Sequence, residues 1–233
     1  MRRLCLFYML FGLIALGEAG CQGPSSIARA RESRAPTIIK EPARVVTRTF
    51  DPANPPADMP PLASTDEVAQ CESDFTANAN VGGQAQRTDS THAVITVSQI
   101  NITLQLNVII WVPEGVSQRV MDHEQGHRQI SEYYYRTADK IAAQIAANYM
   151  GKQVTINGPD IDAAFHKALQ NIGGEITEEY DTQLDPNPTQ LLYDSITDHS
   201  RNDVAVQDAV DHAMKNVAVE SGQPAGADPP ARQ

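Results

Sequence analysis

Two histidines and a glutamate lie within five residues in the stretch "VMDHEQGHRQI", residues 120–130. If this stretch is helical, His123 and His127 are one turn apart and project from the same side. Two imidazoles at this spacing can bind one zinc ion and leave further coordination positions open. Glu124 can then reach a water molecule on the metal and accept its proton as the water attacks a carbonyl carbon. The stretch therefore predicts a hydrolytic zinc site.

The residues around this stretch predict a long helix. Apolar residues and the two histidines recur every three or four positions from about residue 117 to residue 149, and Gly151 follows as an end signal. The alternative is that the histidines are ordinary polar residues on a helix surface. The stripe favours the metal site, because it turns both histidines toward the interior, where an unpaired imidazole is costly.

The segment before the helix predicts a strand with one buried and one wet face. Residues 100–112 alternate between apolar and polar side chains over more than ten positions. Residues 93–97 are apolar in another register, which predicts a turn or bulge near Ser98–Gln99. We expect this strand to border the cleft, where it could bind an extended peptide by strand addition. A simply solvated face is the alternative for its polar residues.

The segments after the helix predict further helices and the remaining metal ligand. A second helix is expected to end at Gly173–Gly174, a third segment to break at "DPNP" (185–188), and a helix to resume from residue 189. His199, in the polar stretch "LLYDSITDHSRND", is the first candidate for the third ligand. The main rival is a carboxylate within residues 175–185, and His92 and His212 are minor alternatives.

Two motifs together resemble a known family. "HEQGHRQISEYYYRTADKI", followed some seventy residues later by "YDSITDH", resembles a family of predicted secreted zinc-dependent proteases of Gram-negative bacteria, catalogued as a domain of unknown function. The resemblance covers roughly residues 92–212. It implies that His123 and His127 are the first two zinc ligands, Glu124 the catalytic acid/base and His199 the third ligand.

The second motif also contains Tyr193 and Asp194. Asp194 would suit orienting an imidazole, and Tyr193 could donate to an oxyanion. The alternative is that they are a pair on a helix surface. The chain departs from the family pattern at Ser200, where the family has glycine, and at the "DPNP" insertion. The first departure affects the turn after His199, and the second affects how the segment that carries His199 approaches the metal.

The first residues predict export. Residues 1–20 have a basic start and an apolar stretch typical of a signal peptide. Small residues before Cys21 indicate a lipoprotein cleavage site, with ordinary cleavage near Ala19 as the alternative. If Cys21 is acylated, Cys71 has no partner; otherwise a Cys21–Cys71 disulfide could form. We expect a periplasmic or outer-membrane lipoprotein, with secretion as the alternative.

The remaining boundaries follow from composition. Residues 21–63 carry eight of the fifteen prolines and predict a spacer with one strand at 43–50. Residues 64–217 form the predicted domain, and 218–233 a disordered tail. The net charge of −11 argues against binding to nucleic acid or anionic lipid, so any membrane contact is expected only through an anchor at Cys21.

The sequence thus predicts an α+β, zincin-like domain, with a short sheet packed on the long histidine-bearing helix and two or three further helices. The expected activity is that of an exported zinc metallopeptidase with Zn²⁺ as cofactor and a peptide or protein as substrate. A cell-envelope lipoprotein that binds zinc without catalysis is the alternative. The sequence leaves the oligomeric state open.

Overall fold

The computed structural model describes residues 35–62 and 67–220, which form a mixed α+β unit. The strands are β1 (Thr37–Lys40), β2 (Arg44–Phe50), β3 (Gln70–Arg87), β4 (His92–Pro113) and β5 (Gln153–Asn157). The helices are α1 (Gln118–Arg136), α2 (Ala138–Tyr149), α3 (Ile161–Gln183), α4 (Asn187–Thr197) and α5 (Val206–Glu220). The predicted signal peptide, Cys21 and residues 221–233 of the predicted tail lie outside the described residues.

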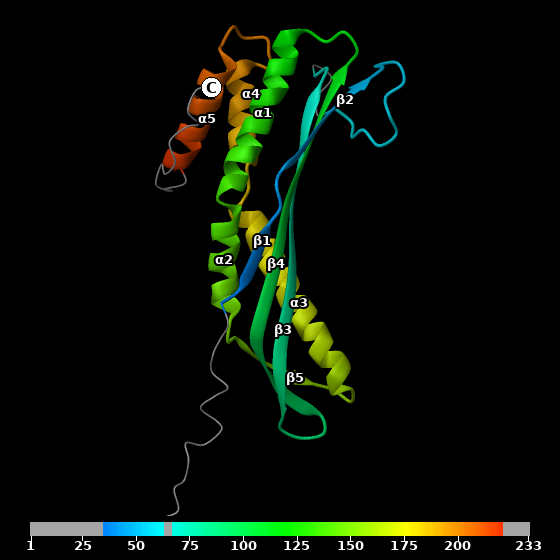
Figure 1. Ribbon diagram of the computed structural model, residues 1–233, viewed down its shortest axis with the longest axis vertical. Coiled ribbons are helices and arrows are strands. Elements are labelled where there is room, and N and C mark those ends of the chain that lie inside the picture. The colour runs from blue at the N-terminus through cyan, green and yellow to red at the C-terminus, as the bar shows by residue number, and fades with distance from the viewer. Residues whose placement is uncertain (1–34, 63–66, 221–233) are drawn as a thin grey trace, which may run out of the picture. The chain divides into compact units, whose positions relative to one another are not determined.

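The sheet is built around β4, which has partners along both edges (Figure 1). Strand β3 pairs antiparallel with almost the whole length of β4. Along the other edge lie β5, antiparallel, and then β1 and β2, both parallel to β4. The expectation that residues 100–112 add a peptide strand is therefore wrong, because neighbouring strands already take up the hydrogen bonds of β4. Among the described residues, β3 is the long strand with an unpaired outer edge, and the shorter strands β1, β2 and β5 also pair with β4 alone.

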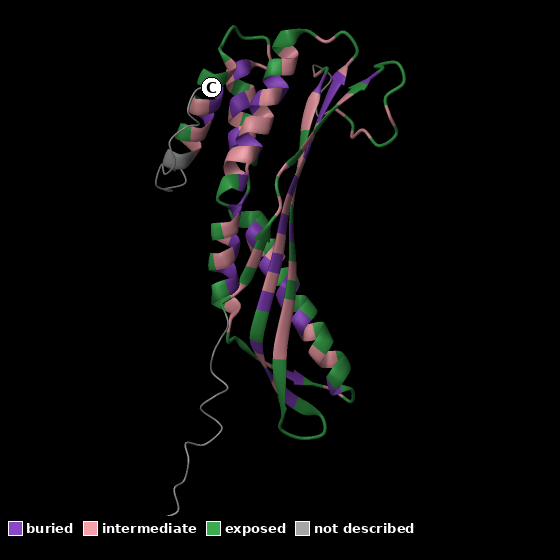
Figure 2. Ribbon diagram, in the orientation of Figure 1, coloured by how far each residue is buried: buried purple, intermediate pink, exposed green. Residues whose placement is uncertain are grey.

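The predicted alternation along β4 and the predicted bulge are both present. Isoleucines, leucines and valines at even positions from 100 to 112 are buried, while Asn101, Thr103, Gln105 and Asn107 are half-buried on the other face (Figure 2). The register to β3 shifts where Gly82 pairs with Gln99 and Gly83 with Val97, leaving Ser98 as the extra residue. This bulge keeps the apolar residues of both halves of β4 on one face.

Part of the proline-rich segment belongs to the sheet. Residues 44–50 form β2, and residues 37–40 form β1, a strand that the sequence analysis did not predict. Both pair in register with β4, and Glu41 donates its backbone N–H to the carbonyl oxygen of Leu104. Residues 37–50 of the predicted spacer are therefore structural strands of the domain.

The long predicted helix is interrupted. Helix α1 ends at Arg136 and α2 begins at Ala138, with Thr137 between them at φ −100° and ψ 1°. The Thr137 hydroxyl donates to the carbonyl oxygen of Tyr134, 3.3 Å away, so the side chain competes with the helical hydrogen bonds of the backbone. The apolar stripe continues across this break, which is why periodicity alone predicted a single helix.

The predicted helix end at Gly173–Gly174 is wrong, because α3 runs through both glycines to Gln183. A Cβ atom on Gly173 would lie 2.9 Å from the carbonyl oxygen of Ala79 on β3. Glycine at this position therefore lets the helix approach the sheet closely and does not end the helix. The predicted break at 185–188 is correct, and Pro188 lies in the first turn of α4.

The helices form two layers on one face of the sheet. Helices α1, α2 and α3 contact the strands, and their apolar residues share a core with the even-numbered side chains of β4. Helices α4 and α5 pack on α1, through a second cluster that contains Ile130, Tyr193 and Val210 (Figure 1). Helix α4 is thereby held between α1 and α5, which fixes its position along the histidine-bearing helix.

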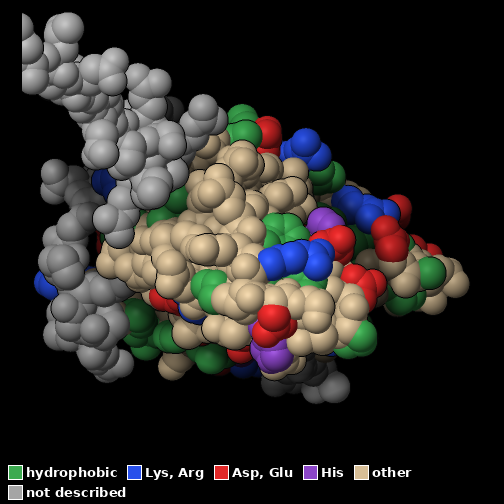
Figure 3. Space-filling model, turned by 90° about the horizontal axis from the view of Figure 1, so that it is seen from below, with side chains coloured by type: hydrophobic (Ala, Val, Ile, Leu, Met, Phe, Trp, Pro, Cys, Tyr) green, Lys and Arg blue, Asp and Glu red, His purple; other side chains and the backbone are tan. Residues whose placement is uncertain are grey.

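No helix in the described part of the chain is long and apolar enough to cross a membrane. In the face shown in Figure 3, Lys and Arg side chains lie close to Asp and Glu side chains. That mixture of signs is typical of a solvated surface.

Candidate metal centre

Helix α1 carries the three residues of the histidine motif on its side that faces the sheet. The helix begins after Ser117, whose hydroxyl accepts the backbone N–H of Val120, so the motif lies in its second and third turns. His123 and Glu124 are 5% and 4% exposed, and His127 is half-buried. Both histidines therefore face inward, as the apolar stripe predicted.

Helix α4 adds a carboxylate to the two imidazoles. Asp194 Oδ1 lies 2.8 Å from Nε2 of His127 and 3.3 Å from Nε2 of His123. The two Nε2 atoms are 3.2 Å apart. In the described part of the chain, these three residues form a group whose ligand atoms all lie within 4.8 Å of one another and could hold a metal ion. Asp194 thus lies close enough to both histidines to be a direct ligand, whereas the sequence analysis gave it an orienting role.

Gln190 orients the second histidine. Its amide nitrogen donates to the carbonyl oxygen of His127 at 3.2 Å and to the hydroxyl of Ser131 at 3.0 Å. Its amide oxygen is therefore the atom 2.6 Å from Nδ1 of His127, so this nitrogen must carry the hydrogen. The Nε2 atom of His127 can then bind a cation or carry a second proton. The positive charge of that cation or proton would attract the Asp194 carboxylate.

Tyr193 of α4 packs against the first histidine, His123. Its ring is fully buried and stacks on the imidazole of His123, with centroids 5.0 Å apart, and its hydroxyl donates to the His123 carbonyl oxygen at 3.1 Å. A Cβ atom at Gly126 would collide with that hydroxyl. The hydroxyl is thus engaged with the backbone and does not line the pocket, which does not fit the predicted role of oxyanion donor.

Glu124 is buried beside the metal-binding group. Its Oε2 atom is buried and has no hydrogen-bond partner among the described residues. Burial raises the pKa of Glu124 to about 7, with the charges of Asp194 and Glu67 acting in the same direction and His127 acting against them. A carboxyl group with a pKa near neutrality can both accept and return a proton.

The Asp194 carboxylate and the two imidazoles shift one another's pKa values. Burial acts to raise the pKa of Asp194, but the two imidazoles lower it more, so its pKa lies well below the ordinary value and it is ionised at neutral pH. Burial lowers the pKa of His123. Burial also acts to lower the pKa of His127, but Asp194 outweighs this effect and the net direction is upward. The ionised Asp194 carboxylate therefore faces the two imidazole nitrogens.

A pocket of about 330 Å³ opens over these residues. One wall is α1, another is the first part of β3 with Gln70, Cys71 and Ser73, and the third is α4 with Gln190 and Asp194. Gln70, Cys71 and Ser73 therefore bring the first part of β3 to the side of the candidate metal centre.

His199 lies at the rim of this pocket, outside the metal-binding group. Its Nδ1 atom is 3.4 Å from Oε1 of Glu67 and 3.8 Å from Oδ1 of Asp194. Asp198, His199 and Ser200 all have positive φ values, 47°, 50° and 71°, so the chain turns sharply after α4. Ser200 adopts the left-handed conformation that glycine prefers.

The other ligand candidates are elsewhere. Glu178, Glu179 and Asp181 lie on α3 and do not line the pocket. His92 pairs with Asp89 at the start of β4, and His212 is exposed on α5. The structure therefore brings together His123, Glu124, His127 and Asp194, with His199 next to them.

Sequence reasoning missed the positions of Gln190 and Gly126. Gln190, Asp194 and Thr197 lie on one side of α4 at helical spacing, and that polar stripe was the available signal. Gly126 gave a weaker signal, a glycine inside a predicted helix. No protein-family model, curated protein or solved structure matches this chain.

Proposed function

We propose that this protein is a zinc-dependent peptidase of zincin-like fold. The observation that carries the proposal is the convergence of His123, His127 and Asp194 beside Glu124, a buried carboxyl group whose Oε2 has no hydrogen-bond partner among the described residues. A merely structural metal site does not need a non-ligating carboxyl group at that position.

The donor set fits zinc in a catalytic setting. Two imidazole nitrogens and one carboxylate oxygen are a common ligand set of catalytic zinc, and three protein ligands leave a position open for water or substrate. Gln190 fixes the orientation of His127, and Tyr193 fixes that of His123. When bound, zinc would lower the pKa of water and polarise the substrate carbonyl group.

The chain's own residues would divide the remaining work. Glu124 accepts a proton from the attacking water and delivers it to the leaving amine, as its pKa near neutrality permits. An extended peptide could pair with the free edge of β3, whose residues Gln70, Cys71 and Ser73 line the pocket. The strand at the cleft is thus β3 in this proposal, in place of residues 100–112.

Localisation follows from residues 1–21 alone. Their signal-peptide pattern and Cys21 support export, either to the periplasm or outer membrane as a lipoprotein or as a secreted protein. The acidic net charge fits a peptide or protein substrate better than nucleic acid.

The test combines metal content with hydrolysis of an unfolded protein such as fluorescently labelled casein. We expect one zinc per chain in the wild type and in Glu124→Gln, with hydrolysis lost only in the variant. Asp194→Ala should lose zinc, and His199→Ala should keep it. Asp203→Ala, an exposed aspartate on the loop after α4, is the matched control and should retain both properties.

The opposite results have distinct meanings. Zinc without hydrolysis in the wild type would favour the non-catalytic zinc-binding lipoprotein. Zinc lost from His199→Ala but kept by Asp194→Ala would restore His199 as third ligand. A wild type that binds no zinc would exclude the peptidase.

A further inference from the structure

The proline-rich segment after β2 forms an apolar pocket of about 480 Å³. Six prolines line it together with Phe50, Met59 and Leu62, and Glu67 is the one charged residue among the described residues that line it. Proline has no backbone N–H, so these walls offer few hydrogen-bond donors. The pocket is therefore suited to an apolar group.

The segment is held in place by its own contacts. Asp51 caps a turn by accepting the backbone N–H of Ala53 at 2.9 Å, and Met59 donates its N–H to the Pro56 carbonyl oxygen at 3.0 Å. The side chain of Gln70 on β3 donates to the carbonyl oxygen of Pro60 at 3.0 Å. The pocket wall is thus tied to the strand that also borders the candidate metal centre.

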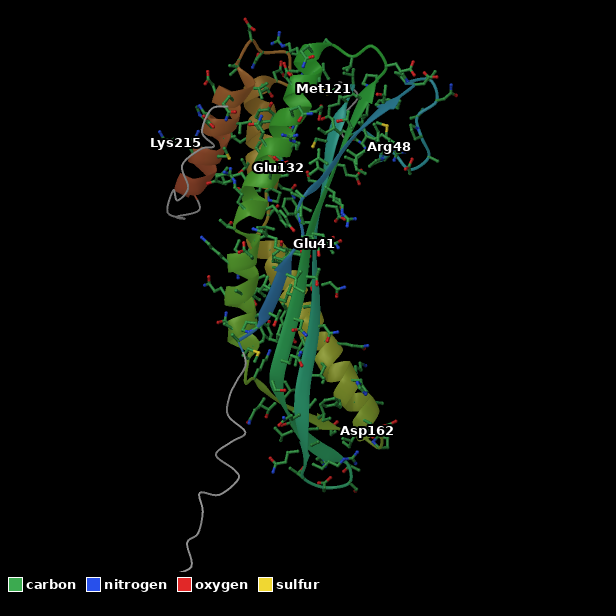
Figure 4. The ribbon with its side chains drawn as sticks, viewed as in Figure 1. Glu41, Arg48, Met121, Glu132, Asp162 and Lys215 are labelled. Atoms are coloured by element: carbon green, nitrogen blue, oxygen red, sulfur yellow. The ribbon has the colours of Figure 1, made fainter. Side chains whose placement is uncertain are left out.

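A second tie comes from Arg48 on β2, labelled in Figure 4. Its guanidinium group lies 4.1 Å from the ring centroid of the buried Trp111 and forms an ion pair with the Asp58 carboxylate at 2.6 Å. The prolines already restrict the backbone, and these contacts hold it in place. The pocket wall is therefore largely preformed, and a ligand need not lose binding free energy in ordering it.

The apolar pocket adjoins the pocket over the candidate metal centre. Glu67 and Val68 line both of them. Val68 is 53% exposed, so its apolar side chain is accessible between the two pockets. A peptide lying along the free edge of β3 at Gln70 would pass Val68 on its way from one pocket to the other.

We propose that the apolar pocket is the specificity pocket of the enzyme and takes a large apolar side chain of the peptide substrate, such as phenylalanine or leucine, close to the scissile bond. This inference rests on the proposed peptidase function. It gives the proline-rich segment a role in binding, where the sequence alone indicated a spacer.

The first test maps the cleavage sites of unfolded casein by mass spectrometry with the full chain. Large apolar residues should be favoured at one fixed position beside the cut, by about tenfold or more over glycine and alanine. Met59→Trp, which fills the pocket, should shift that preference to small residues. Ile39→Trp makes the same kind of change at a half-exposed apolar residue on β1 and should leave the preference unchanged.

A preference that is absent, or that is the same in Met59→Trp as in the wild type, would overturn the proposal. If the chain cleaves nothing, the proposed function fails, and the pocket is then tested by binding alone. A variant with Glu124→Gln and ¹³C-labelled methionine methyl groups is mixed with a casein-derived peptide that contains phenylalanine, or with its glycine counterpart. The Met59 resonance should move only with the phenylalanine peptide, and Met150 at the end of α2 should not move. Equal responses to both peptides, or none, overturn the pocket assignment.

Discussion

Two helical glycines lie at close approaches between elements of the described residues, and they differ in what they bring together. Gly173 brings α3 against the backbone of β3, where the neighbours are a carbonyl oxygen and the side chain of Val81. Gly126 brings α1 against Tyr193 of α4, where the neighbour is a side chain that stacks on a candidate metal ligand. The first contact holds a helix on a sheet, and the second sets the position of His123.

The difference indicates how the molecule separates stability from chemistry. The α3–β3 region is packed mainly with apolar side chains, among them Ile172 and Ile176. The α1–α4 region adds a chain of polar contacts in which Gln190 links the backbone and ring of His127 to Ser131. We therefore expect changes in the first region to alter the free energy of unfolding, and changes in the second to alter metal binding first.

Gly126→Ala should have the largest effect. Alanine favours a helix by about 1 kcal/mol over glycine, so a position with free space would be stabilised. Here the added Cβ collides with Tyr193 and displaces the ring from His123, so zinc binding and hydrolysis should be lost. Metal content of the purified variant measures this. Retention of stoichiometric zinc would show that the ring does not position His123.

Gln190→Ala should weaken zinc binding without abolishing it. The variant removes the acceptor of the His127 Nδ1 hydrogen, and loss of such an outer contact typically costs about 10–100-fold in metal affinity. Competition with a chelator gives the affinity directly. Leu191→Ala, at the exposed neighbouring residue of α4, is the control and should leave the affinity unchanged.

Gly173→Ala and Gly174→Ala should change stability in opposite directions. A Cβ at Gly173 lies too close to the Ala79 carbonyl oxygen, so we expect a loss of about 1–3 kcal/mol. Gly174 has open space around its Cβ position, so alanine there should add about 1 kcal/mol through helix propensity. Urea unfolding measures both. Zinc content should be the same in the two variants, and a loss of zinc in Gly173→Ala would break the separation between the regions.

The same contrast explains what the sequence could predict. Periodicity identified β4, the bulge at Ser98 and the inward face of α1, because each depends on side chains close together in the chain. It failed at Gly173, where the reason for glycine is a strand about ninety residues earlier. A helix end and a close approach look alike in sequence, since both favour glycine.

Which residue of this segment lies against the two histidines was beyond local patterns for a related reason. Asp194 and His199 are both polar residues near the end of one segment, and their spacing does not tell which of them meets the histidines. The answer depends on how α4 lies between α1 and α5, which is set by the cluster around Tyr193 and Val210. Likewise, the pairing of β1 and β2 with β4 is a long-range contact that composition rich in proline did not indicate.

The last prediction concerns Cys71, which lines the wall of the candidate metal pocket. Burial, with the charge of Glu124 as a second cause, raises the pKa of its thiol to about 12. Thiolate is the reactive form, so alkylation by iodoacetamide at pH 8 should be about a thousandfold slower than in the unfolded chain, where the pKa is about 8.5. Because the folded state keeps this proton as the pH rises above about 8.5, the thiol lowers stability progressively between there and pH 12. Mass spectrometry of the Cys71 peptide, after labelling with and without guanidinium, measures the protection. Fast labelling in the folded protein would mean that this wall of the pocket opens to solvent. The Cys71→Ala variant lacks the thiol, so its free energy of unfolding should fall less steeply as the pH rises above about 8.5.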